Sequence, residues 1–132
     1  MTVTVDELLA RARRMLDRVQ PADVPAALAA GAVLVDIRSD AQRAADGVVP
    51  GAVRVARNVL EWRCDPASRW RREDVSDPAR QVILVCDEGY QSSLAAATLQ
   101  ELGLPRATDL VGGFQAWRAA GMPVEQAGVP VS

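Results

Sequence analysis

The N-terminal residues follow a helical pattern of apolar and polar positions. Apolar side chains recur at spacings of three and four and predict an amphipathic helix over residues 4–20. Thr4 followed by Glu7 is the sequence of a capping box, which begins this helix, and Pro21 ends it. The apolar face is expected to contain Val5, Leu8, Leu9, Ala12, Leu16 and Val19. The opposite, solvated face is expected to carry Arg11, Arg14 and Arg18.

Farther along the chain, helical patterns alternate with short apolar runs. The apolar runs predict strands over residues 32–37, 53–56, 82–85 and 108–111. Helices are predicted over residues 23–31, 93–102 and 114–120. Such alternation predicts an α/β fold with a largely parallel sheet and helices on both faces. Residues 61–80, rich in Arg, Asp and Pro, are expected to form a loop with one helical turn.

The chain length of 132 residues fits one compact domain. We divide it into an N-terminal helical extension, 1–20, a main domain, 21–126, and a C-terminal tail, 127–132. The extension is expected to pack on the main domain through its apolar face. A contact with a second copy or with another partner is the alternative.

Composition removes several kinds of catalysis. The chain has no His, and all 15 basic residues are Arg. Mechanisms that need an imidazole base, a His metal ligand or a catalytic lysine are therefore excluded. With two Cys and no His, a structural zinc site is not expected, and we predict neither a metal nor a cofactor.

Charge and cysteine usage bear on partners and compartment. A net charge of −2 gives no field that favours nucleic acid or an anionic membrane, so neither is an expected partner. No apolar run is long enough for a membrane span, and the N-terminus lacks the pattern of a secretory leader. Two widely separated cysteines indicate free thiols in a reducing cytoplasm.

Cys86 is the strongest candidate for a reactive residue. It directly follows the strand 82–85 and precedes a loop that contains Gly89, the position at which open parallel sheets bind ligands. Such a loop can direct backbone N–H groups toward the sulfur as an anion nest, and the next helix N-terminus favours the thiolate. Gly89 is expected to supply a turn that a side chain resists. The alternative is that Cys86 is a buried core cysteine.

Three stretches resemble the signatures of single-domain rhodaneses. Residues 35–38 and 47–52 read V-D-I-R and G-V-V-P-G-A, similar to the D-V-R and G-H-I-P-G-A of that family. Residues 86–91 look like its six-residue active-site loop, C-x-x-G-x-x. Residues 110–117, L-V-G-G-F-Q-A-W, look like its L-x-G-G-x-x-x-W element. The resemblance extends over residues 21–125.

The resemblance implies a five-stranded parallel sheet flanked by helices, and sulfur transfer as the activity. In the family a cysteine takes a sulfane sulfur from a donor such as thiosulfate, becomes a persulfide and passes the sulfur to cyanide or a thiol. Carried over here, Cys86 is the nucleophile and sulfur carrier. The implied substrate-binding residues are Asp87, Glu88, Gly89, Tyr90, Gln91 and Ser92. Asp36 and Arg38 are expected as supporting residues, in an ion pair or in hydrogen bonds that fix a loop.

Two features depart from the family pattern. The active-site loop carries Asp87 and Glu88 and no basic residue, which opposes both the thiolate and a bound thiosulfate dianion. We therefore expect a small neutral persulfide or a persulfidated protein to suit this loop better as donor. Gln42 stands near the place of a family glutamate, so Arg38 is expected to lose its usual ion-pair partner.

The stretch 54–72 combines six arginines with Trp62 and Trp70. One of these arginines would offset the loop charge if the stretch lies at the mouth of the site. The interpretation that we favour is a solvated loop with the tryptophans as packing anchors. Cys64, in the same stretch, is interpreted as an unreactive thiol, with a role as resolving partner of Cys86 as the alternative.

Two other functions compete with sulfur transfer. The acidic loop keeps a rhodanese-fold binding or regulatory module with little turnover as the main alternative. A phosphatase or arsenate reductase of the C-x5-R type is disfavoured, because Ser92 occupies the position of the arginine clamp that those enzymes need.

Overall fold

A four-stranded parallel sheet forms the centre of the molecule. The computed structural model describes residues 1–128. The strands lie in the order β2-β1-β3-β4, and their bounds are β1 Val33–Asp36, β2 Val53–Arg54, β3 Val82–Val85 and β4 Ala107–Asp109. The parallel α/β fold is confirmed. The expected fifth strand is reduced to a single bridge, in which Val19 pairs in parallel with Leu110 beside β4.

In the described part of the chain, six helices surround the sheet: α1 Val5–Arg14, α2 Val24–Ala29, α3 Asp40–Asp46, α4 Leu60–Cys64, α5 Gln91–Glu101 and α6 Gly113–Ala119. Single 3₁₀ turns cover Pro21–Asp23, Arg57–Val59 and Glu73–Val75. α3 was not expected from the sequence. None of the residues of α3 is buried, so it has no apolar face to detect, and its only signal is the capping box of Ser39 and Gln42.

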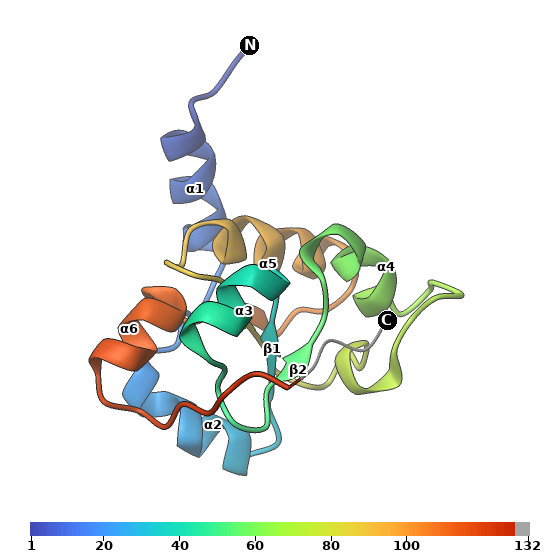
Figure 1. Cartoon of the computed structure of the whole chain (residues 1–132). Coiled ribbons are helices and arrows are strands. Elements are labelled where there is room, and N and C mark those ends of the chain that lie inside the picture. The colour runs from blue at the N-terminus through green and yellow to red at the C-terminus, as the bar shows by residue number, and fades with distance from the viewer. Residues whose placement is uncertain (129–132) are drawn as a thin grey trace.

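Alternate residues of the central strands feed two hydrophobic cores. Val35 and Leu84 point into one core, with α4 and α5, whereas Leu34 and Ile83 point into the other, with α2 and α6. Trp117 of α6 is only 3% exposed and belongs to the second core. In Figure 1, α2 lies on the far side of the sheet from α5.

The N-terminal segment packs on the domain but differs from the predicted helix. α1 ends at Arg14, six residues before the predicted end, and packs against α5 (Figure 1). Val5 and Leu8, expected on the buried face, are 68% and 42% exposed, while Ala12, Leu16 and Val19 are buried. Beyond α1 the chain runs beside β4, where the Val19 N–H donates to the Asp109 carbonyl at 3.0 Å.

The C-terminal segment after α6 packs beside the connection between α3 and β2. Val48 and Glu125 form an antiparallel bridge with hydrogen bonds in both directions, at 2.8 and 2.9 Å. Of the predicted tail, 127–132, residues 129–132 lie outside the described residues. Within residues 1–128, no helix is both long enough and apolar enough to cross a bilayer.

Candidate active site

Cys86 lies at the carboxyl end of β3, where the following loop closes around its sulfur. The side chain is only 2% exposed. The backbone N–H of Gly89 donates to Sγ at 3.1 Å, so the loop folds back on the cysteine. Gly89 has φ of +83°, and an added Cβ would lie 2.8 Å from the Gly112 nitrogen. The expected glycine turn is confirmed, and Cys86 is both buried and part of a loop site.

Several N–H groups around the loop are free to bind an anion. Among residues 1–128, the N–H groups of Glu88, Tyr90 and Gln91 have no hydrogen-bond acceptor. α5 begins at Gln91, two residues earlier than predicted, and Tyr90 at its N-cap makes no side-chain cap. The first turn of an uncapped helix presents unpaired N–H groups and a partial positive charge. This arrangement favours an anion beside the Cys86 sulfur.

The other side of the loop is held by the start of α6. The N–H groups of Phe114 and Gln115 donate to the carbonyls of Cys86 and Asp87, at 2.9 and 3.0 Å. Gly113 makes this approach possible, because its φ is +62° and an added Cβ would lie 2.6 Å from the Cys86 oxygen. The carbonyls of the loop are therefore directed away from the sulfur.

Ser92 links the sulfur to a buried carboxylate that sequence reasoning missed. The Ser92 Oγ lies 3.2 Å from the Cys86 Sγ and 2.7 Å from Oδ2 of Asp109. Asp109 is fully buried and also accepts a hydrogen bond from the Ser93 Oγ at 2.8 Å. The Ser92 hydroxyl has one hydrogen, so it either accepts from the thiol while donating to Asp109 or donates to a thiolate. The position of Asp109 at the end of β4, on the same sheet edge as Cys86, was the available signal.

Two arginines of the N-terminal segment contact the outer side of the loop, away from the Cys86 sulfur. The Nη2 atoms of Arg13 and Arg18 donate to the Gly89 carbonyl, at 2.8 and 3.1 Å. Arg18 also forms a two-contact pair with Asp109, at 2.8 and 3.2 Å. The prediction that Arg18 faces solvent was wrong, because the helix ends at Arg14 and the next residues follow a different path.

Asp36 and Arg38 form a buried pair beside the loop that follows β1. Arg38 is 1% exposed and binds both oxygens of Asp36, at 3.1 and 2.9 Å, and the Gly47 carbonyl at 2.8 Å. Its guanidinium lies 3.8 Å from the centre of the Phe114 ring. The expected pair of Asp36 and Arg38 is present, and Gln42 does not act as a partner of Arg38, because its side chain accepts from the Ser39 N–H and caps α3. This pair supports the α6 side of the site through Phe114.

The acidic residues of the loop line the mouth of the site. A shallow pocket of about 390 Å³ is lined by Cys86, Asp87, Glu88, Tyr90, Gln91 and Gln42. The Asp87 carboxylate accepts from the Gln115 amide at 2.9 Å, whereas Glu88 is exposed. Both carboxylates therefore lie where an anionic donor approaches.

The stretch 54–72 contributes residues to two separate pockets, one beside the pocket at Cys86 and one apart from it. Arg54 and Arg57 line a pocket of about 470 Å³ that shares Gln42 and Gln91 with the pocket at Cys86, so two arginines lie next to the mouth. Each is paired with a carboxylate, Arg54 with Asp40 at 3.3 Å and Arg57 with Glu61 at 2.9 Å.

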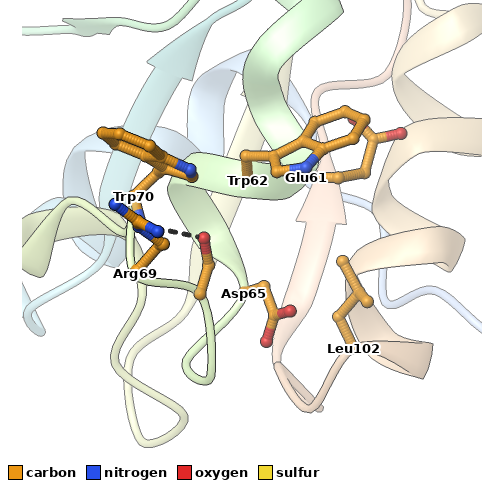
Figure 2. Close-up of a pocket in the computed structure, with 7 residues that line it drawn as sticks. Glu61, Trp62, Asp65, Arg69, Trp70 and Leu102 are labelled. Carbon is orange, nitrogen blue, oxygen red and sulfur yellow. Dashed lines mark hydrogen bonds between the residues drawn. The ribbon is translucent and has the colours of Figure 1, made fainter.

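Trp62 and Trp70 do not act as packing anchors. Each is 56% exposed, so this prediction was wrong. Together with Arg69 they line a separate open pocket of about 410 Å³, shown in Figure 2. The Arg69 guanidinium lies 4.7 Å from the Trp70 ring centre, and the ring remains in solvent.

Cys64 is an unreactive thiol in the core. It is fully buried in α4 and forms no disulfide with Cys86. Burial raises the pKa of the Cys64 thiol to about 12, and Glu61 and Asp74 add to this shift. The thiol is therefore protonated at neutral pH, as the favoured interpretation required.

Comparisons with known proteins assign the family. The sequence profile of the rhodanese-like domain matches residues 20–120. Thiosulfate sulfurtransferase GlpE of Actinobacillus succinogenes is 33% identical over 96 residues, which cover 73% of this chain and 78% of the relative. The GlpE protein of Pseudomonas entomophila is 34% identical over 102 residues, which cover 77% and 84%.

Solved structures agree with this assignment. A protein from Rhodopseudomonas palustris, described as of unknown function and as a possible tyrosine phosphatase, has a TM-score of 0.84 at 33% identity, covering 95% of this chain and 96% of that one. The homodimeric polysulfide-sulfur transferase of Wolinella succinogenes shares the fold, with a TM-score of 0.72 at 22% identity over 90% and 85% of the two chains. The profile match and the curated relatives, together with a cysteine loop at the carboxyl end of β3, show that this chain belongs to the rhodanese-like domain family.

Proposed function

We propose that this protein, a sulfurtransferase by its family and its relatives, carries sulfane sulfur as a persulfide on Cys86. The observation that carries the proposal is the enclosure of the Cys86 sulfur by a loop whose Gly89 N–H donates to it at 3.1 Å. The N–H groups of Glu88, Tyr90 and Gln91 also have no acceptor among the described residues. A cradle of donors stabilises the thiolate and then the persulfide anion that replaces it.

The reaction consists of two half-reactions. The Cys86 thiolate attacks the outer sulfur of thiosulfate, a new S–S bond forms at Sγ, and sulfite leaves with the electron pair of the broken S–S bond. An acceptor thiolate or cyanide then attacks the terminal sulfur, and the Cys86 thiolate leaves. No general base is required once the thiol is ionised, which suits a chain without His. Ping-pong kinetics are expected.

The donor is a small sulfane-sulfur compound, with thiosulfate or a persulfide as candidates and a persulfidated protein as the larger alternative. The relatives are named for thiosulfate, and Arg54 and Arg57 line the adjacent pocket, each paired with a carboxylate. Against this, Asp87 and Glu88 line the pocket that contains Cys86. We expect these carboxylates to weaken thiosulfate binding more than that of a less charged persulfide.

Neutral replacement of the two loop carboxylates is expected to improve thiosulfate turnover. One unit charge at 4 Å contributes about 1 kcal/mol in water, so Asp87→Asn and Glu88→Gln should each raise kcat/KM for thiosulfate about fivefold. The gain should shrink with added salt, because the pocket is open to solvent. Glu101→Gln, an exposed change at the far end of α5, is the matched control and should leave kcat/KM unchanged. Equal kcat/KM values for thiosulfate in all four proteins would show that the acidic loop does not limit the donor.

Intact mass spectrometry tests the persulfide directly. The reduced protein is incubated separately with thiosulfate and with a low-molecular-weight persulfide, and a gain of one sulfur atom that cyanide removes is expected. The donor that loads the protein identifies the donor class. A protein that gains no sulfur from either donor, while Cys86 still reacts with an alkylating reagent, would contradict sulfur transfer and favour the binding module.

Phosphoryl transfer does not fit this loop, although the Rhodopseudomonas relative is described as a possible phosphatase. Ser92 stands where a C-x5-R loop has its arginine, and its hydroxyl binds Asp109. Arg13 and Arg18 contact the outer side of the Gly89 carbonyl, not the cradle. A planar arginine clamp for phosphate is therefore missing from the loop.

The protein is proposed to act in the reducing cytoplasm. Both cysteines are free thiols, which a reducing compartment maintains. A persulfide on Cys86 also survives longer where no oxidant competes for it.

A further inference from the structure

The N-terminal segment contributes two side chains to the active-site loop from outside the matched domain. Arg13 in the last turn of α1 and Arg18 in the connection that follows both precede residue 20, where the family profile begins to match. Both donate to the same carbonyl, that of Gly89, whose own N–H binds the Cys86 sulfur. One residue thus joins the two arginines to the reacting atom.

Arg13 is held in place by three partners at the start of α5. Its Nη2 lies 2.8 Å from the Gly89 oxygen, and its Nε donates to the Ser93 Oγ at 3.2 Å. Its guanidinium also lies 5.6 Å from the centre of the Tyr90 ring. All three partners are uncharged, and Arg13 forms no ion pair with residues 1–128, so it brings a full positive charge to the loop.

Arg18 reaches the sulfur by a second route. It binds both oxygens of the buried Asp109 and, at 3.1 Å, the Gly89 carbonyl. Asp109 in turn accepts from the Ser92 hydroxyl, which lies 3.2 Å from the Cys86 sulfur. Arg18 therefore balances the charge of Asp109 and fixes the group that orients Ser92.

The contacts at the Gly89 carbonyl affect the orientation of the whole Gly89–Tyr90 peptide. A trans peptide is planar, so the N–H of Tyr90 points away from the Gly89 carbonyl that the arginines bind. Charge-assisted hydrogen bonds are stronger than neutral ones and hold this peptide in one orientation. They also increase the polarity of the Tyr90 N–H, which has no acceptor among the described residues.

We propose that Arg13 and Arg18 are positioning residues for Cys86, which hold the Gly89–Tyr90 peptide in its anion-binding orientation and supply from behind the positive charge that the loop lacks. The proposal rests on the proposed function, because it treats the loop as the cradle of a thiolate and its persulfide. It makes the N-terminal segment part of the active site.

The charged groups packed around Cys86 come from several elements. The loop provides Asp87 and Glu88, the end of β4 provides Asp109, and the N-terminal segment provides the two arginines. The end of β1 and α3 provide the Asp36, Arg38 and Arg43 group. Because Asp109 pairs with Arg18, and Asp36 pairs with Arg38 and Arg43, the uncancelled charges nearest the loop are those of Arg13 and the two loop carboxylates.

The test compares Arg13→Gln with Arg14→Gln, its exposed neighbour in the same turn of α1. The rate of Cys86 alkylation by iodoacetamide is measured from pH 5 to 10, with the label located by peptide mass. We expect Arg13→Gln to lower the rate at pH 7 about fivefold and to move the profile to higher pH, with the high-pH plateau retained. Arg14→Gln should follow the wild-type profile. Arg13→Lys should restore part of the rate, because it keeps the charge but not the planar fork.

Arg18 is tested by the double variant Arg13→Gln/Arg18→Gln, which should shift the profile further than Arg13→Gln alone. Since Arg18→Gln leaves Asp109 without its cation, thermal stability is measured alongside, and Arg13→Gln remains the decisive variant if the double variant unfolds. A profile for Arg13→Gln that matches Arg14→Gln, or one lowered equally at every pH, would overturn the proposal.

The alkylation readout separates this proposal from the proposed function. A shift with Arg13→Gln in a protein that takes up no sulfur would support the positioning role and contradict sulfur transfer. Normal sulfur uptake together with an unshifted profile would contradict the positioning role alone.

Discussion

Replacing Cys86 by serine is expected to reduce sulfur transfer to background. A serine hydroxyl cannot form a persulfide, and the cradle around Cys86 offers no second nucleophile, because the Ser92 hydroxyl is bound to Asp109. Thiocyanate formation from thiosulfate and cyanide measures turnover, and intact mass measures the carrier. Cys86→Ser should show neither turnover nor a gain of sulfur, while its thermal stability stays close to that of the wild type.

Cys64→Ala is the matched control for this loss. Cys64 is fully buried and its pKa is raised to about 12, so its thiolate is nearly absent at neutral pH. The variant should load sulfur and turn over like the wild type, and iodoacetamide at pH 8 should label only Cys86 in the folded wild-type protein. A mass gain that persists in Cys86→Ser and disappears in Cys64→Ala would show that Cys64 carries the sulfur and would contradict the proposed role of Cys86.

The second large effect is expected for Gly113→Ala at the start of α6. The φ of +62° disfavours any side chain by about 1–2 kcal/mol. The added methyl would also lie 2.6–2.7 Å from the oxygens of Cys86 and Asp87 and from the Gly89 nitrogen, and such overpacking costs about 1–3 kcal/mol. The loop must move to relieve these contacts. Because a displacement of about 1 Å at a reacting group costs about 100-fold, kcat/KM should fall by that amount.

Gly121→Ala is the control that separates the effect of the close contacts at Gly113 from the effect of its positive φ. Gly121 has a similar φ of +73° but no atom within 4 Å of an added Cβ. This variant should lose only about 1–2 kcal/mol of unfolding free energy and keep full activity. Denaturant unfolding and sulfur transfer are measured on both variants. Equal activity losses in the two would show that the loop does not depend on the close approach at Gly113.

The sequence predicted those parts of the molecule that depend on local pattern. Strand runs and glycine turns depend on residues close in sequence, so the position of β3, the turn at Gly89 and the location of Cys86 at a sheet edge were predictable. α3 was not predicted because a seven-residue helix without a buried residue has no apolar face.

The parts that were missed or wrong depend on where distant segments meet. Nothing in the neighbours of Arg13 or Arg18 indicates a contact with Gly89, which lies more than 70 residues away in the sequence. The early end of α1 decides this contact, and helix ends are poorly marked when no glycine or proline stands there.

The bridge between Val19 and Leu110 also protects the sheet. β4 is the outermost strand on that side, and an outer strand with unpaired N–H and C=O groups is a template for another chain. Val19 donates to the Asp109 carbonyl and accepts from the Val111 N–H at 2.9 Å, so the carbonyl at the end of β4 and the N–H two residues beyond it are already occupied. A protein shortened to the matched domain would begin at residue 20 and present this edge uncovered. Removal of residues 1–19 is therefore expected to open this edge to pairing with a strand of another chain, in addition to releasing the loop.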